Sequence, residues 1–323
     1  MPHLINIAGR LRPFSHEPGA KCLIPGTPYI VEAFPARVRI WEFDGRILQE
    51  IELPAKGPLK QFTLMQDLER GCVSVFSEQY RIHILPNLKI LFSKNSHLPS
   101  LENQERLSFG SHKKMDSEAL RRRRDLSALF SIWFRLGSLL KLPPRSKDNR
   151  GVFRLLEDCR TIQHPELIMN AFEKLFLVGF ESLFIPRSSD TQFQGIIDPK
   201  EPSSVDSALY LLTEGAALIR SLFFSAFEDS ISILPRLPPQ LFAGRMTDVV
   251  SLHGSFDFEW TKKTIRRLQC KAQRDGVITI NFQPQMVSCR LRLHPKDKGQ
   301  IFQCGDSLAI KSGSIYLLDR FQK

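Results

Sequence analysis

The sequence predicts an α+β chain of several domains, in which a short helical middle separates two β-rich ends. Residues 1–95 alternate β-forming and polar residues between tight-turn signals, and residues 230–323 repeat this pattern at even spacing. Residues 116–229 place apolar side chains at helical spacing instead. We therefore expect an N-terminal β-sandwich or barrel-like domain (1–95), a linker (96–115), about four helices (116–229) and a C-terminal antiparallel β-sandwich (230–323). A chain of 323 residues is long enough for two or three domains.

The N-terminal region carries its clearest signal around Asp44-Gly45. The segments ARVRIWEF (36–43) and RILQEIEL (46–53) on either side are both rich in alternating β-formers. Asp-Gly between two such runs predicts a hairpin, because both residues tolerate the positive φ of a tight turn. Further short strands are expected at 62–64, 72–76, 80–85 and 88–92.

Capping and proline signals delimit the helical region. Asp116 or Ser117 is a good N-cap for a helix that runs to about Leu142, where Pro143-Pro144 ends it. A later helix begins with Pro165 in its first turn, a position that suits proline. In order, the predicted helices cover 116–142, 151–159, 165–185 and 205–228.

Short strand patterns fill the C-terminal region. The dipeptides Asp275-Gly276 and Ser312-Gly313 are strong turn signals between them. The predicted strands cover 230–234, 248–253, 255–260, 264–272, 277–282, 287–293, 300–304, 308–310 and 314–318. Even spacing of this kind is typical of a β-sandwich.

Composition excludes several classes of protein. Apolar residues make up 42% of the chain and include 24 Phe, so a disordered protein is excluded. The six cysteines lie at least 15 residues apart without a CxxC pair, a distribution typical of reduced thiols and a cytoplasmic protein. The start of the chain lacks the apolar core of a secretory signal. The longest apolar runs are interrupted by Glu181, Glu214 and Arg220, so we expect no membrane span.

No motif in the sequence indicates a cofactor. The phosphate-binding loop, the dinucleotide fingerprint, the zinc-protease helix and the nucleophile elbow are all absent from it. The eight histidines are dispersed without the spacing of metal ligands. We therefore expect neither a cofactor nor a metal site.

Residues 106–150 are strongly basic, with 12 Lys or Arg against four acids, a net charge of +8. Such an excess predicts either a solvated helix face and linker or a surface that binds a polyanion such as nucleic acid. Consecutive residues on a helix point in directions about 100° apart, so Arg121, Arg122, Arg123 and Arg124 would not all face one partner. With Lys113 and Lys114, these four arginines are the candidate polyanion-binding residues.

Two carboxylates of the last predicted helix are candidate catalytic groups. Glu214 lies inside the apolar run LYLLTEGAALI, where burial would raise its pKa as a general acid or base requires. Asp206 is the nearest candidate for the second carboxylate that glycosidic hydrolysis needs. The alternative is a structural Glu214 that pairs with Arg220 or reaches a domain interface.

Glu259 and Trp260 are candidate ligand-binding residues. An acidic side chain next to an aromatic ring is typical of sites where a sugar stacks on the ring. The alternative places Trp260 in the core of the C-terminal sandwich.

Residues 213–260 resemble the C-terminal part of the (α/α)6 inverting glycoside hydrolases, especially the α-L-fucosidase family. In that family a Gly/Ala-rich apolar helix closes a helical barrel and enters a C-terminal β-domain through a Leu-Pro-rich segment. The matching features here are the Ile233–Pro238 segment (ILPRLP), Gly244, Gly254 and Trp260. The family also has a β-sandwich before its helices, so the order of domains is similar.

The resemblance implies a much truncated relative. Twelve helices of about 11–12 residues need on the order of 200 residues with their loops, and the predicted helical region is far shorter. The family's general base precedes an Asn-Phe-Gly-Gly-Thr run, and Leu209–Leu212 (LYLL) stands there instead. Asp206 and Glu214 are close to that position but out of register.

Three functional hypotheses follow. The first is a non-catalytic, glycoside-hydrolase-like scaffold that binds carbohydrate or a protein partner. The second is a remodelled glycosidase that uses Glu214 with a second carboxylate. The third is a protein that binds an anionic partner, such as nucleic acid, through residues 106–150.

Overall fold

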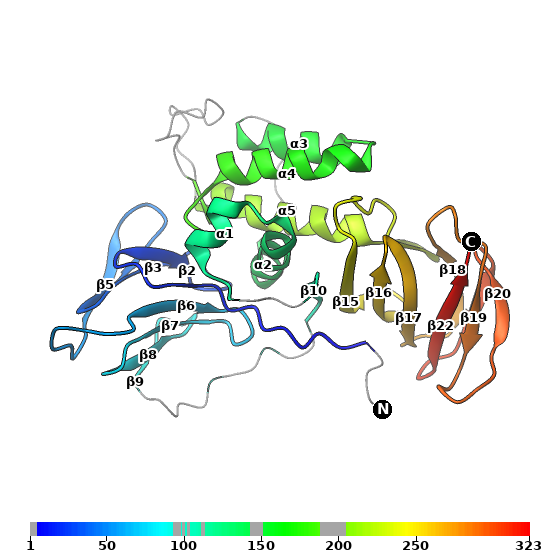
Figure 1. The fold of residues 1–323 in the computed structure, drawn as a ribbon, viewed down its shortest axis with the longest axis horizontal. Helices are drawn as coiled ribbons and strands as arrows, with labels where there is room; N and C mark the ends of the chain where they lie inside the picture. The colour runs from blue at the N-terminus through cyan, green and yellow to red at the C-terminus, as the bar shows by residue number, and fades with distance from the viewer. Residues whose placement is uncertain are drawn as a thin grey trace.

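The computed structural model describes residues 5–92, 98, 101, 104–110, 114–142, 151–187 and 205–323, and for 205–207 the backbone alone. These residues form many strands and five helices. Figure 1 shows the N-terminal strands at one end of the molecule, the helices in the middle and the C-terminal strands at the other end. The predicted α+β architecture with two β-rich ends is confirmed.

Two antiparallel sheets form the N-terminal part. One has the order β1-β6-β7-β8-β9, with β1 (Phe14–Ser15), β6 (Thr63–Asp67), β7 (Cys72–Phe76), β8 (Arg81–Ile84) and β9 (Ile90–Phe92). The other has the order β2-β3-β4-β5, with β2 (Ala20–Leu23), β3 (Ile30–Phe34), β4 (Arg37–Trp41) and β5 (Ile47–Glu52). Side chains of both sheets, among them Val31, Val38 and Val75, share one apolar core, so this part is a β-sandwich.

The hairpin predicted around Asp44-Gly45 is confirmed. Strands β4 and β5 pair antiparallel, with Arg37 opposite Glu52, and Gly45 takes a φ of 90° in the turn between them. The two β-branched residues Val38 and Ile40 of β4 are fully buried, while their neighbours are partly exposed. This alternation explains why the sequence pattern was sufficient to locate the strand.

The helices are α1 (Ser117–Arg123), α2 (Leu126–Leu139), α3 (Val152–Thr161), α4 (Pro165–Gly179) and α5 (Val205–Phe223). The prediction of one helix over 116–142 is wrong, because Arg124 takes a left-handed conformation (φ 53°, ψ 39°) that ends α1. Asp116 caps α1 as expected, and its side chain accepts from the Ala119 N–H. Asp125 caps α2 in the same way by accepting from Ser127 N–H, so the chain restarts a helix at once.

Two helices end earlier than predicted. Helix α4 stops at Gly179 instead of 185, and the next residues form a short hairpin of β11 (Phe180–Glu181) and β12 (Ile185–Pro186). Helix α5 stops at Phe223 instead of 228, where β13 (Phe224–Phe227) begins and pairs with β14 (Ser230–Ile233). Tertiary packing ends both helices, because Phe180 and Phe224 are buried at 1% exposure in extended backbone.

Two sheets form the C-terminal part. The seven-stranded sheet has the order β10-β15-β16-β17-β22-β19-β20, with β10 (Arg106–Ser108), β15 (Ala243–Val250), β16 (Gly254–Thr261), β17 (Thr264–Ala272), β22 (Ile315–Gln322), β19 (Ser288–Arg292) and β20 (Gln300–Gln303). The four-stranded sheet has the order β13-β14-β18-β21, with β18 (Gly276–Asn281) and β21 (Ser307–Ile310). All pairs in these sheets are antiparallel except β14 with β18, which is parallel.

One apolar core joins the helices to the C-terminal sheets. The ring of Phe223, at the end of α5, stacks on Trp260 of β16 with 5.3 Å between centroids. Within the helices, Gly215 of α5 lies against the indole of Trp133 in α2, and an added Cβ would be 2.3 Å from that ring. The helical region is therefore not an independent bundle.

Part of the expected linker is structured. Residues 106–108 form β10, whose Leu107 lies opposite Met246 at the edge of the C-terminal sheet. Leu107 is 1% exposed, and its burial explains why this strand forms within an otherwise polar stretch. In sequence, β10 follows the last strand of the N-terminal part and precedes the first helix.

Candidate ligand-binding pocket

A row of charged residues with alternating sign crosses the seven-stranded sheet. Residues directly opposite one another on neighbouring strands point to the same face of a sheet. On β15, β16, β17, β22 and β19, the successive partners in this row are Arg245, Glu259, Arg267, Asp319 and Arg290. The row places three guanidinium groups and two carboxylates on the face that lies away from the aromatic core.

Glu259 is the centre of the first half of the row. Its Oε1 lies 2.7 Å from Arg267 Nε, and its Oε2 lies 3.3 Å from Arg245 Nε. The Glu259 side chain is 13% exposed, whereas Arg245 and Arg267 are 51% and 53% exposed. The carboxylate is therefore fixed, while each arginine keeps N–H donors that face solvent.

Asp319 is the centre of the second half. Its Oδ1 accepts from Arg290 Nε at 2.8 Å, and Arg292 of β19 also pairs with it. Partial burial alone would raise the pKa of Asp319, but the hydrogen bond from Arg290 and the charges of both arginines outweigh burial. The pKa of Asp319 is consequently held below its ordinary value, and the carboxylate stays ionised.

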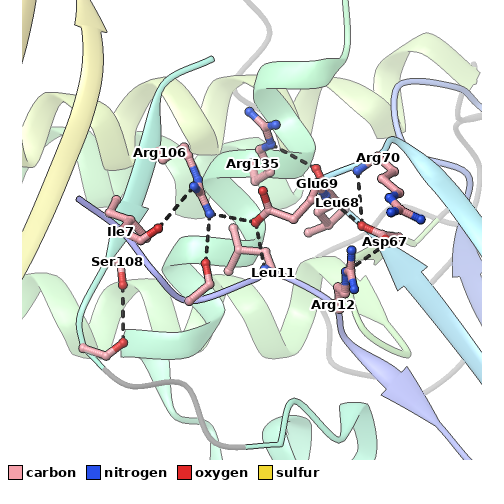
Figure 2. Close-up of polar contacts among 12 residues, drawn as sticks. Ile7, Leu11, Arg12, Asp67, Leu68, Glu69, Arg70, Arg106, Ser108 and Arg135 are labelled. Carbon is pink, nitrogen blue, oxygen red and sulfur yellow. Dashed lines mark hydrogen bonds and ion pairs between the residues drawn. The ribbon is translucent and has the colours of Figure 1, made fainter. Parts of the chain in front are cut away.

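The N-terminal segment of residues 5–11 lies against one end of this face. Arg245 Nη1 donates to the Asn6 carbonyl at 2.9 Å. Arg106 of β10 donates to the Ile7 carbonyl at 3.4 Å and to the Gly9 carbonyl at 2.9 Å (Figure 2). Two arginines of the C-terminal sheet thus hold the backbone of a segment that precedes the N-terminal sandwich.

Arg106 is itself held by Glu69, in the turn after β6. The two side chains form an ion pair of 2.9 Å, and the same Glu69 oxygen accepts from the Leu11 N–H at 2.9 Å (Figure 2). Arg135 of α2 donates to the Leu68 carbonyl at 3.2 Å. Burial lowers the pKa of Arg135, which is 2% exposed, although the nearby Glu69 charge opposes that effect. This network connects the N-terminal sandwich, helix α2 and β10.

A pocket of about 550 Å³ opens between the N-terminal segment and the sheet. Its walls are residues 7–9, 108–110, 243–245 and 259–261, together with Arg267. The volume lies in the range of small-molecule sites, about 300–1,000 Å³. Four segments far apart in sequence build the pocket, so its existence depends on the contacts of Arg106 and Arg245.

The pocket presents hydrogen-bonding groups of both kinds. Arg245 and Arg267 supply charged donors, and Glu259 supplies carboxylate acceptors. The Phe109 ring also lines the pocket and lies 5.9 Å from Trp260 between centroids, in an edge-on arrangement. Such a site suits a polar ligand that both donates and accepts, as a sugar hydroxyl does.

Both predicted ligand-binding residues, Glu259 and Trp260, line this pocket. Trp260 is 1% exposed, and its Nε1–H donates to the Leu241 carbonyl at 3.1 Å. Its ring therefore packs in the core at the wall of the pocket and exposes little surface. The roles of Glu259 and Trp260 in binding stay predictions.

Of the two predicted catalytic carboxylates, the structure describes the side chain of Glu214 and not that of Asp206. Glu214 is 32% exposed and pairs with Arg160 of α3 at 2.8 Å, and not with Arg220. Arg220 pairs instead with Glu105, at 2.7 Å. Asp206 belongs to α5, but its side chain lies outside the described residues. The predicted catalytic pair therefore stays a prediction.

The basic cluster is divided by the end of α1. Arg121, Arg122 and Arg123 occupy the last helical turn, and Arg124 leaves the helix to pair with Glu173 at 2.9 Å. Arg122 and Arg123 are exposed and form no recorded ion pair with any described residue. Lys114 is exposed, and Lys113 lies outside the described residues. Polyanion binding through this surface stays a prediction.

Sequence reasoning missed Arg245 and Arg267, the two arginines that flank Glu259. The signal available was weak, because isolated charged residues at alternate strand positions are typical of any solvated sheet face. Only the register of three strands brings them together. No sequence pattern predicted that the N-terminal segment would lie against this sheet, since its partners lie about 100 and 240 residues away.

Three further findings concern the part of the chain that the structure describes. There, no group of three or more His, Cys, Asp or Glu side chains is arranged to hold a metal ion. Burial raises the pKa of Cys72 to about 11 and that of Cys270 to about 12, so these thiols are protonated at neutral pH and are poor nucleophiles. None of the helices described is both long enough and apolar enough to span a membrane.

Neither a scan against protein-family models nor a search of curated proteins finds a match. The resemblance of residues 213–260 to glycoside hydrolases therefore stays a prediction.

Proposed function

We propose that this protein is a non-catalytic scaffold that binds carbohydrate in the pocket beside Glu259. The observation that carries the proposal is the geometry of Glu259, which is fixed between Arg245 and Arg267 at the floor of an open 550 Å³ pocket. Sugars are recognised through many hydroxyl groups, each of which both donates and accepts. Alternating guanidinium and carboxylate groups on a rigid sheet offer both functions at fixed spacing.

The absence of catalysis is part of the proposal. Glycosidic hydrolysis by the usual route needs two carboxyl groups on either side of the scissile bond. Glu259 is the single carboxylate among the described residues that line this pocket. Both of its oxygens are also engaged by arginine side chains, Arg245 and Arg267.

A truncated relative of the (α/α)6 glycoside hydrolases is consistent with this function. The contact of Phe223 with Trp260 joins the last helix to the C-terminal sandwich, as the resemblance implies for that junction. We propose that the chain keeps this domain packing without the family's reaction. The pocket would then serve recognition alone.

The test is a calorimetric titration, in which the 323-residue chain is titrated with a panel of neutral and acidic oligosaccharides. Glu259→Gln keeps the side-chain shape but removes the charge that holds both arginines, so we expect binding to weaken about tenfold or more. Arg154→Gln, an exposed position on α3, is the matched control and should bind normally. No binding by any member of the panel, or equal binding by Glu259→Gln, would refute the proposal.

A further inference from the structure

A groove of about 770 Å³ lies on the N-terminal sandwich, far from strand β16 and the pocket beside Glu259 (Figure 1). Strands β1, β6 and β7 supply its floor, and its walls come from the loops beside these strands, together with Pro35 and Lys114. Its volume lies in the range of small-molecule sites, about 300–1,000 Å³. None of its lining residues belongs to the pocket beside Glu259, so the groove is a separate candidate site.

The floor of the groove is apolar, although it lies on the outer face of the sandwich. Phe14 of β1 lies opposite Met65 of β6, and Phe76 of β7 lies opposite Thr63, two residues before Met65, so these side chains share one face. Leu64, between Thr63 and Met65, points the other way and belongs to the sandwich core. The outer face of an antiparallel sheet is usually polar. Packing of the sandwich therefore does not account for three large apolar side chains on this face.

The apolar side chains of the groove are partly shielded from solvent. Phe14, Leu59, Met65 and Phe76 are half-buried, and Phe62 is 7% exposed. Single apolar residues on a surface are common and need no partner, but a concave group of them is typical of a binding site. Water in such a groove has few polar partners, so an apolar ligand displaces it favourably.

Lys114 gives the groove a positive rim. It is the single lysine or arginine among the described lining residues, and none of those residues is a carboxylate. Its side chain is exposed and forms no recorded ion pair with any described residue. Asp116, two positions further on, is engaged with the Ala119 N–H at the start of α1. The Arg81 guanidinium lies 4.6 Å from the centroid of the Phe76 ring and adds a second positive charge. An anionic group is therefore favoured at this rim.

We propose that this groove binds a free fatty acid, with the acyl chain along Phe14, Met65 and Phe76 and the carboxylate paired with the Lys114 ammonium. The proposal does not depend on the proposed sugar binding. An acyl chain bends to fill an irregular apolar groove, whereas its carboxylate has to stay hydrated or ion-paired. A ligand without charge would leave Lys114 unpaired, and a compact anion such as phosphate would leave the apolar floor uncovered.

The experiment titrates the 323-residue chain by calorimetry with octanoate, decanoate and dodecanoate, each below its micelle concentration. Decanol is the uncharged match for decanoate. Burial of each methylene contributes to binding, so we expect affinity to rise about fourfold or more with every two methylenes added. Decanoate should bind roughly three- to fivefold more tightly than decanol, because an exposed ion pair contributes modestly. This preference should decrease at high salt.

Two variants test the two parts of the groove. Lys114→Gln removes the charge at the rim and should abolish the preference for decanoate over decanol. Met65→Gln places a polar amide on the floor and should weaken the binding of both ligands about tenfold. Lys60→Gln, at an exposed position between the lining residues Leu59 and Gln61, is the matched control and should bind like the original protein. The melting temperature of each variant verifies that it is folded.

Three results would overturn the proposal. Equal binding of decanoate and decanol by the original protein would show that Lys114 does not hold the carboxylate. Fatty-acid binding that neither Lys114→Gln nor Met65→Gln changes would place the ligand elsewhere on the chain. If none of the three carboxylates binds, the groove holds no fatty acid, and the proposed sugar binding is unaffected.

Discussion

The guanidinium of Arg106 lies 2.9 Å from the carboxylate of Glu69, and this ion pair joins the edge of the C-terminal sheet to a turn of the N-terminal sandwich. Both side chains are largely buried, at 26% and 20% exposure. The same Arg106 holds the Ile7 and Gly9 carbonyls, which form a wall of the pocket. A contact between the two β-rich parts therefore also supports the candidate site.

We expect Glu69→Gln to lower both stability and ligand affinity. The substitution removes the charge that pairs with Arg106 and weakens the acceptor of the Leu11 N–H. Hydrogen bonds to charged groups contribute roughly 1.5–3 kcal/mol, so urea denaturation should report a loss of about 2 kcal/mol. Glu78→Gln, at an exposed position of the same sandwich, should leave stability unchanged. Equal stability of the two variants would contradict the role assigned to Glu69.

Gly215→Ala should destabilise the contact between α2 and α5. The added Cβ would lie 2.3 Å from the Trp133 ring, which is itself fully buried. Overpacking of this kind costs roughly 1–3 kcal/mol, visible as a lower melting temperature. Gly276→Ala is the control, because its added Cβ would meet His253 at an ordinary 3.6 Å. A normal melting temperature for Gly215→Ala would show that the helices repack without cost.

Asp319 should make stability fall in acid. Its pKa is lower in the folded protein than in the unfolded chain, where it is about 3.9. Its contribution is therefore complete above pH 4–5 and decreases as the pH falls through the folded-state pKa. Asp319→Asn should reduce stability at pH 7 and flatten the pH dependence below about pH 4. Parallel stability curves for the two proteins between pH 2 and pH 7 would be inconsistent with this ion-pair cluster.

Charge reversal at Arg122 and Arg123 tests the polyanion hypothesis. Both side chains are exposed, whereas Arg124 is engaged with Glu173. Each cation that contacts a polyanion releases counterions, so Arg122→Glu/Arg123→Glu should elute from a heparin column at lower salt. Arg124→Gln is the comparison, and we expect it to elute close to the original protein. If the double variant elutes unchanged, this surface does not bind polyanions.

Local sequence patterns located most strands and helix starts. The Asp44-Gly45 hairpin and the Asp116 cap were predicted because each depends on residues that are neighbours in sequence. The ends of α4 and α5 were misplaced, because burial of Phe180 and Phe224 against distant residues overrides helical periodicity. The end of α1 at Arg124 was not predicted either, because arginine is not a residue type that is typical of turns.

The residues of the candidate site were harder to predict from the sequence than the strands and helices. Glu259 was chosen for its place beside Trp260, and both residues line the pocket, although Trp260 is 1% exposed. Its flanking arginines come from two other strands, and the wall of residues 7–9 comes from the far end of the chain.

The sequence by itself determined the order of β, helical and β regions, because hydrophobic periodicity and turn chemistry act over a few residues. Tertiary structure alone decided the register that aligns Arg245, Glu259 and Arg267, and the ion pair of Arg106 with Glu69 that holds the pocket wall. Such pairings depend on distances between residues far apart in the chain, and no local pattern encodes which of many similar charges will meet.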